Sequence, residues 1–256
     1  MIRSGFGETY AVYNDGFTMP IEHISDTARW VATYRAWETK RPDALFHDPY
    51  AGRLAGERGE EIVRNLKRGK EFAWAMIVRT AVMDEIVLKQ VAQGADTVVN
   101  LAAGLDARPY RLQIPSTLRW IEVDLPDILK YKEEALKNDK PVCRLDRIYM
   151  DLSNLEERRK LFREINDQSK KVLVITEGLL IYLTAEQVGA LASDLHDQPR
   201  FEHWLCDISS PGLLKMLNRT HSSWLKASGI RMQFAPEGGP DYFRSQTIPA
   251  RFDRGR

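Results

Sequence analysis

The sequence predicts an α/β fold in which a doubly wound, mostly parallel sheet carries helices on both faces. Two observations predict it. Short apolar runs rich in β-branched residues recur from residue 97 onward, and helical patterns separate most of them. Strands that alternate with helices form parallel sheets, because each helix returns the chain to the edge where the next strand begins.

The composition is that of a globular protein. The chain has 256 residues, of which 43% are apolar and 29% charged, and this length suffices for one large α/β domain or for a domain plus a helical lid. The formal net charge of +1 creates no field that would attract polyanions. We therefore expect neither nucleic acid nor a membrane surface as a partner.

Cysteine and histidine usage predicts no metal site. The two cysteines and five histidines show no spacing typical of metal ligands, and two scattered thiols fit a reducing compartment. Residues 1–16 lack the apolar core of a signal peptide, and no apolar run reaches the roughly 18 residues of a membrane span. We expect a cytoplasmic protein.

Residues 1–93 are expected to form an N-terminal helical cap. A helix capped by Ser25 or Asp26 should run to about Lys40, where Pro42 ends it. The next segment, 43–56, has turn signals and is predicted as a loop, and a charged helix should follow over 57–67. The strongest helical pattern covers 72–93 and ends at Gly94.

Residues 94–208 are expected to form the α/β core, the cofactor-binding unit. Its strands are predicted at 97–101, 118–123, 147–150, 172–176 and 201–208. Its helices are predicted at 126–138, 155–168 and 184–196.

Residues 209–256 are expected to form a C-terminal lid segment and tail. From Pro236 onward the chain is rich in Gly, Pro and Arg, and no strand pattern follows 201–208. The fifth strand should therefore be an open edge of the sheet. No terminal pair of strands is predicted to follow it. Since an open edge invites pairing with another chain, a homodimer is one expectation.

A turn of small residues follows the first predicted strand. In open α/β sheets, ligands bind beyond the carboxyl ends of the strands, and Gly104 lets main chain approach a ligand closely. Asp124 ends the second run 20 residues later, the offset of an acid that binds ribose hydroxyls. Its alternative role is to cap the helix that begins near Pro126.

The charge of the turn favours S-adenosylmethionine over NAD. The turn holds a single glycine, and Asp106 lies where a pyrophosphate would sit in a dinucleotide site. A carboxylate repels a diphosphate, whereas S-adenosylmethionine carries an ammonium and a sulfonium but no phosphate. An oxidoreductase of the same general fold is therefore disfavoured. Asp106 and Arg108 are also expected to pair and brace the loop.

Three motifs in order resemble one methyltransferase group. The string NLAAGLDARPYRL at 100–112 is similar to the signature NLGAGLDTRPYRL of leucine carboxyl methyltransferases and their bacterial relatives, which include O-methyltransferases of polyketide-type metabolism. Segments 122–126 and 176–183 resemble the second and fourth motifs, and 28–51 resembles the N-terminal region. The likeness spans roughly residues 25–245. One departure is Ala102, which replaces the first glycine of the signature.

The resemblance implies a class I, Rossmann-like methyltransferase fold with S-adenosylmethionine as cofactor. It implies that Arg79 holds the cofactor carboxylate, that Gly104 contacts the methionine moiety and that Asp124 binds the ribose. By the same resemblance Asp151 and Leu152 meet the adenine, and Glu177 lies near the amino acid end. The full predicted cofactor set is Arg79, Ala103, Gly104, Asp106, Asp124, Leu125, Asp151, Leu152 and Glu177.

The hypothesis for function is methyl transfer to an oxygen of a small-molecule acceptor. A carboxylate acceptor is ionised near neutral pH and needs no base, whereas a hydroxyl needs one or needs desolvation. Tyr182 is the candidate on the substrate side, and packing is an equally good interpretation of it. Asp151 could instead cap a helix. The alternative function is a cofactor-binding protein of the same fold without turnover.

Overall fold

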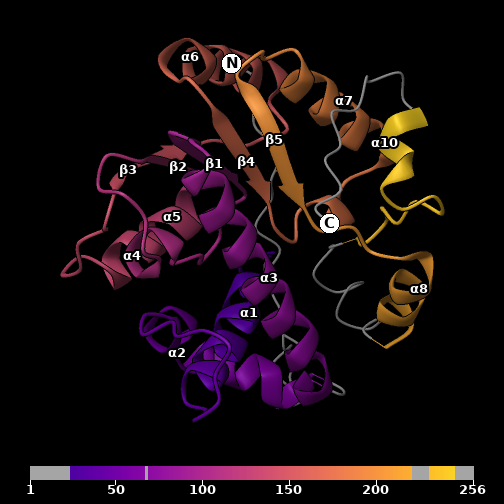
Figure 1. Ribbon diagram of the computed structural model, residues 1–256. Helices are drawn as coiled ribbons and strands as arrows, with labels where there is room; N and C mark the ends of the chain where they lie inside the picture. The colour runs from indigo at the N-terminus through magenta and orange to yellow at the C-terminus, as the bar shows by residue number, and fades with distance from the viewer. Residues whose placement is uncertain (1–23, 67–68, 221–230, 246–256) are drawn as a thin grey trace, which may run out of the picture.

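A computed structural model describes residues 24–66, 69–220 and 231–245, and these contain a five-stranded parallel sheet (Figure 1). The strand order is β3-β2-β1-β4-β5, so the chain reverses its direction of winding between β1 and β4. This confirms the predicted doubly wound α/β fold. The strands are β1 (Thr97–Leu101), β2 (Arg119–Asp124), β3 (Arg144–Tyr149), β4 (Val172–Thr176) and β5 (Phe201–Cys206).

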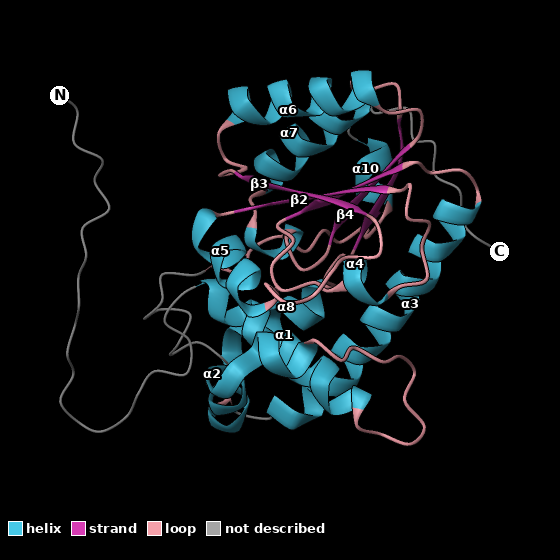
Figure 2. Ribbon diagram, turned by 90° about the vertical axis from the view of Figure 1, so that its left-hand side faces the viewer, coloured by secondary structure: helices cyan, strands magenta, loops and turns pink. Residues whose placement is uncertain are grey.

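One face of the sheet is covered by α6 (Leu155–Gln168) and α7 (Ala185–His196), which lie above it in Figure 2. Phe162 of α6 and Leu191 of α7 share a buried cluster with Val99 and Val174. Both helices begin with a side-chain cap, which accepts a hydrogen bond from a first-turn N–H group that has no partner within the helix. The side chain of Asn154 accepts a hydrogen bond from the main-chain N–H of Glu157, and α7 begins with a capping box.

The other face carries α3 (Ala73–Ala92), the short α4 (Arg108–Arg111) and α5 (Pro126–Ala135) (Figure 2). Val87 of α3 packs against Val98 and the fully buried Trp120. Beyond this layer lie α1 (Ile24–Thr39), α2 (Ala51–Asn65) and the 3-10 turn η1 (Gly69–Phe72). The carboxyl ends of the strands therefore face a second layer of helices.

Some predicted boundaries are wrong, and each error has a local cause. The segment 43–56 was predicted as a loop, but α2 begins at Ala51 and passes through a kink at Gly56, where φ is 61°. Ala51 and Leu54 are fully buried, so tertiary packing stabilises this first turn. β3 begins at Arg144 rather than at 147, because exposed polar residues alternate along this edge strand and hide its apolar pattern.

The region after β5 adds helices and, among the residues that the structure describes, no strand. These helices are α8 (Pro211–Thr220) and α10 (Asp241–Ser245). Phe243 of α10 packs edge-on against Trp204 of β5, with ring centroids 5.2 Å apart. The expected domain divisions after residues 93 and 208 and the homodimer stay predictions. None of the helices in the described part of the chain has the length and apolar content to cross a membrane.

Ala102 has a left-handed main-chain conformation, with φ of 54°, immediately after β1. An L-residue there costs about 1–2 kcal/mol, and glycine removes this cost while losing about 0.5–1 kcal/mol of unfolded-state entropy. We predict that Ala102→Gly raises the free energy of unfolding by about 0.5–1 kcal/mol. Equilibrium urea unfolding measures the change.

Ala103→Gly is the matched control, because Ala103 is the next residue, is buried and has no positive φ. It should destabilise the protein by about 1 kcal/mol through lost burial and added chain entropy. Equal losses of stability in the two glycine variants would show that the left-handed conformation of Ala102 carries no strain.

Candidate functional site

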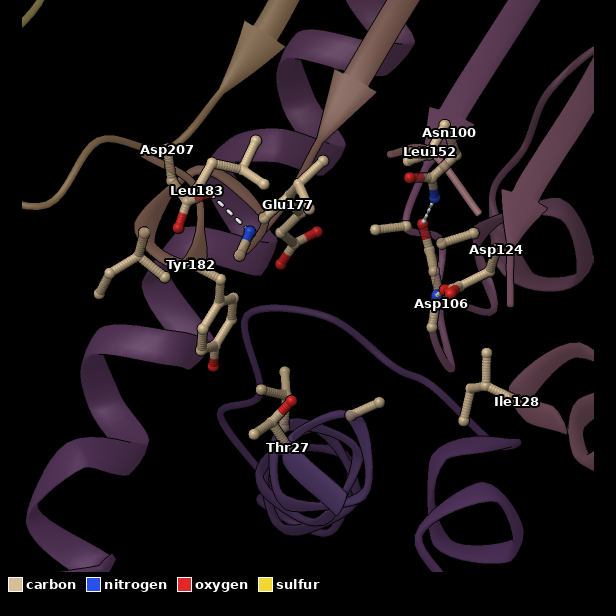
Figure 3. Close-up of a pocket in the computed structure, with 18 of the residues that line it drawn as sticks. Thr27, Asn100, Asp106, Asp124, Ile128, Leu152, Glu177, Tyr182, Leu183 and Asp207 are labelled. Carbon is tan, nitrogen blue, oxygen red and sulfur yellow. Dashed lines mark hydrogen bonds between the residues drawn. The ribbon is translucent and has the colours of Figure 1, made fainter. Parts of the chain in front are cut away.

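A cavity of about 880 Å³ lies at the carboxyl ends of the strands, at the switch point between β1 and β4 (Figure 3). Segments that follow all five strands line it, together with side chains from α1, α3 and α8. The structure brings every residue of the sequence-predicted site to this one cavity, although their contacts with a ligand stay predictions. These residues are Arg79, Ala103, Gly104, Asp106, Asp124, Leu125, Asp151, Leu152, Glu177 and Tyr182.

The turn after β1 and the end of β2 are joined through Asp124. The main-chain N–H of Gly104 donates to its Oδ2 at 2.6 Å, and the N–H of Leu125 donates to its Oδ1 at 2.7 Å. Leu125 is the N-cap of α5, which has no side-chain cap, so Asp124 does not cap that helix. Each carboxylate oxygen keeps a further lone pair that can accept a ligand hydroxyl.

The environment of Asp124 and Gly104 is confined. Burial raises the pKa of Asp124 above its ordinary value of 3.8, although the two main-chain N–H groups act to lower it. Gly104 has φ of 48°, and a Cβ built on it would lie 3.3 Å from Cβ of Ala28 in α1. Glycine therefore serves two needs here, a left-handed conformation and the close approach of a helix.

Arg108 is a buried cation that joins three segments of the site. Its Nε donates to Asp84 of α3 at 2.6 Å. Its Nη1 donates to Asp106 at 2.8 Å and to Glu177 at 2.7 Å. The Asp106–Arg108 pair expected from the sequence is thus present. Asp106 also accepts a hydrogen bond from Asn100, so its carboxylate is held in place beside the cavity (Figure 3).

Arg108 and neighbouring cations keep two acids of the site, Asp106 and Glu177, ionised. Burial acts to raise the pKa of Glu177, but Arg108 and Arg79 outweigh it and lower that pKa from 4.5 to about 2. Burial also opposes ionisation of Asp106, and Arg108 and other nearby cations hold its pKa well below the usual range. Both carboxylates are therefore charged at neutral pH.

Arg79 of α3 bonds two acids that follow neighbouring strands. Its Nε donates to Glu177 at 3.0 Å, and its Nη1 donates to Asp207 at 2.9 Å. Asp207 also accepts the main-chain N–H of Gly178 at 2.6 Å. Asp207 is not among the sequence-predicted residues, although it directly follows β5 in the way that the other acids follow their strands.

Asp151 and Leu152 lie after β3 at the far side of the cavity from Asp207. The carboxylate of Asp151 is exposed and accepts the main-chain N–H of Ser153 at 2.8 Å. The cap of α6 is Asn154, so the alternative interpretation of Asp151 as that cap is wrong. Asp151 therefore keeps a carboxylate at the cavity that can accept from a ligand.

Tyr182 lies in the 3-10 turn η2 (Leu180–Tyr182) and points into the cavity on the side of Thr27 (Figure 3). Burial raises the pKa of Tyr182, and a hydrogen bond with Thr27 offsets part of the rise. Its ring also packs against the buried cluster that contains Trp30 and Leu217. Both interpretations from the sequence, packing and cavity lining, are therefore compatible with its position.

The fold and this cavity define a Rossmann-like α/β protein with a candidate ligand site at the switch point of its sheet. The chain belongs to the leucine carboxyl methyltransferase family, whose model matches residues 28–196. A relative from Frankia alni, named "Putative S-adenosyl-L-methionine-dependent methyltransferase", is 35% identical over 177 residues, covering 64% of this chain and 61% of that protein. A relative of the same name from Rhodococcus jostii is 34% identical over 200 residues, covering 75% and 64%.

Solved structures show the same fold at low identity. A DUF574 family protein from Streptomyces avermitilis aligns with a TM-score of 0.56 at 15% identity, covering 85% of this chain and 81% of that one. A structure described as a "putative methyltransferase" from Thermobifida fusca aligns with a TM-score of 0.56 at 13% identity, covering 86% of this chain and 78% of that one. The chain spans less than two thirds of the length of the Frankia and Rhodococcus relatives.

Glu177→Gln should destabilise the folded protein by about 3 kcal/mol at neutral pH, because it leaves Arg79 and Arg108 without their shared carboxylate. A folded-state pKa of about 2 against an ordinary 4.5 means that the stabilisation is present above pH 4.5 and lost as the pH falls toward 2. Urea unfolding of both proteins between about pH 7 and pH 3 measures it.

Glu186→Gln is the control, because Glu186 lines the same cavity but is exposed. This change should alter stability by less than about 0.5 kcal/mol at every pH. If the difference in free energy of unfolding between the unchanged protein and Glu177→Gln does not decrease in acid, the role given to Glu177 is contradicted.

Proposed function

We propose that this protein transfers the methyl group of S-adenosylmethionine to an oxygen atom of a small-molecule acceptor. The observation that carries the proposal is the pairing of Asp124 with the Gly104 turn at the switch point, with Arg79 and Glu177 across the same cavity. Membership in a methyltransferase family supports it. The volume of about 880 Å³ is sufficient for a nucleoside and a second molecule.

The donor set suits a phosphate-free, cationic nucleoside. Asp124 offers carboxylate lone pairs to ribose hydroxyls, and Asp151 offers an acceptor to an exocyclic amine. Arg79 is a donor for a carboxylate, whereas Glu177 and Asp207 offer negative charge to an ammonium group. A diphosphate would instead face Asp106 and Asp124 at the turn, where both charges repel it.

The residues of the site would act by alignment. When bound, S-adenosylmethionine supplies an electrophilic methyl group on its sulfonium. Asp124 would fix the ribose end and Arg79 the amino acid end, so that the reactive centre faces the side of the cavity where Tyr182 lies. Well-oriented reactants gain on the order of 7–11 kcal/mol of barrier lowering. Tyr182, whose pKa is raised by burial, would remain a protonated donor rather than a base.

Asp124→Asn should weaken binding of S-adenosylhomocysteine by about 1–3 kcal/mol, roughly 5- to 150-fold in Kd, because the amide accepts only on one side. Isothermal titration calorimetry at neutral pH measures the change. Asp127→Asn provides the control, since Asp127 lies three residues after Asp124 in the first turn of α5 but is exposed and does not line the cavity.

Three outcomes separate the proposal from its rivals. Equal affinities for the two variants would refute the ribose role of Asp124. Binding of NAD in place of S-adenosylhomocysteine would refute the cofactor. Binding of S-adenosylmethionine without methylated product from a broad set of acceptors would leave a cofactor-binding protein without turnover, which was the alternative from the sequence.

A further inference from the structure

The cavity has an apolar half beyond Arg79 and Glu177. Side chains from α1, α3, η2 and α8, together with Met232, enclose it. Trp30, Leu217 and Met232 are buried in one cluster, and the half-buried Phe72 and Met76 pack against them. Figure 3 shows Tyr182 and Thr27 on this side and Asp124 and Ile128 on the opposite side. The residues assigned to ribose and adenine lie away from this half, which leaves it to the acceptor.

No lysine or histidine among the described residues lines the cavity, and its arginines already bond carboxylates. Each of these guanidinium groups pairs with at least one carboxylate of the protein, and Arg79 is the one assigned to the cofactor. The pairs are Arg35–Asp48, Arg79–Glu177, Arg108–Asp106, Arg111–Asp84 and Arg158–Asp194. An anionic acceptor in the apolar half would lose hydration, and among the described residues of that half it would meet no cation that lacks a carboxylate partner, so its burial carries a large cost.

Two neutral polar side chains lie among the described residues of the apolar half. The hydroxyls of Tyr182 and Thr27 lie there, and a phenol and an alcohol can each donate to or accept from an uncharged oxygen. Met76 and Met232 are flexible and polarisable, so they adapt to the shape of an aromatic or aliphatic molecule. This combination selects for apolar surface with a single neutral polar group.

We propose that this half of the cavity binds an uncharged apolar acceptor that presents a hydroxyl group, such as a phenol, in preference to a carboxylate. The inference rests on the proposed function, because it takes the other half as the cofactor site. It also decides between the two oxygen acceptors that the sequence leaves open.

The test compares 1-naphthol with 1-naphthoate, two probes of the same ring system that differ in charge at neutral pH. Each is titrated calorimetrically into protein saturated with S-adenosylhomocysteine. We expect naphthol to bind at least about tenfold more tightly, because the ionised carboxylate is desolvated without a partner. Equal binding, tighter binding of naphthoate, or no binding of naphthol would overturn the inference.

Met76→Arg adds a cation to the wall of the apolar half and should shift the ratio of the two affinities toward naphthoate. Val82→Arg adds the same charge on the exposed side of the same helix, where Val82 is 47% exposed, and should leave the ratio unchanged. An equal shift in both variants would mean that the charge acts from outside the cavity, and would count against the inference.

Binding of S-adenosylhomocysteine to each variant is measured first, which separates the two proposals. If the unchanged protein does not bind S-adenosylhomocysteine, the proposed function and this inference are both overturned. If it binds S-adenosylhomocysteine but prefers naphthoate, the inference alone is overturned.

Discussion

The site depends on one buried guanidinium. Arg108 is 1% exposed, and its bonds to Asp84, Asp106 and Glu177 connect helix α3, the turn after β1 and the end of β4. Without that cation, Asp106 and Glu177 would repel each other at the switch point of the sheet. Breaking a buried charge cluster of this kind costs several kcal/mol, so it fixes the position of the cavity wall before any ligand arrives. The turn that carries Gly104 is held by the same network.

The parallel sheet explains why these groups meet. All five strands end at one edge, so acids separated by many residues in the sequence lie around one cavity. Helix α1 approaches the turn closely, so a side chain at position 104 would crowd Ala28 and strain the left-handed main chain. The cavity therefore has two halves. Charged groups at the strand ends line one half, and apolar side chains from α1, α3, η2 and α8 line the other. In the proposed function the first half binds a charged nucleoside, and the second half binds the molecule that accepts the methyl group.

The sequence was sufficient for the central strands and for naming residues that the fold brings to one cavity. β1 and β4 are buried along their whole length, so their apolar runs gave the right bounds. The edge strands were harder, because exposure breaks the apolar pattern in β3 and because the run at β5 continues to Ile208, which packs in the core after the strand has ended. Asp207 was missed for that reason, since it was placed inside the predicted strand. The partners of Arg79 and Arg108 could not be predicted, because ion pairs between distant segments depend on the tertiary arrangement.

A crystal structure of the protein with S-adenosylhomocysteine tests the central claim most directly. We expect ribose hydroxyls within hydrogen-bond distance of the Asp124 carboxylate, the adenine beside Asp151 and Leu152, and the amino acid end beside Arg79 and Glu177. The apolar half between α1, α3 and α8 should stay open to a second molecule. A nucleoside bound in the apolar half, or an Asp124 carboxylate turned away from the ligand, would contradict the account.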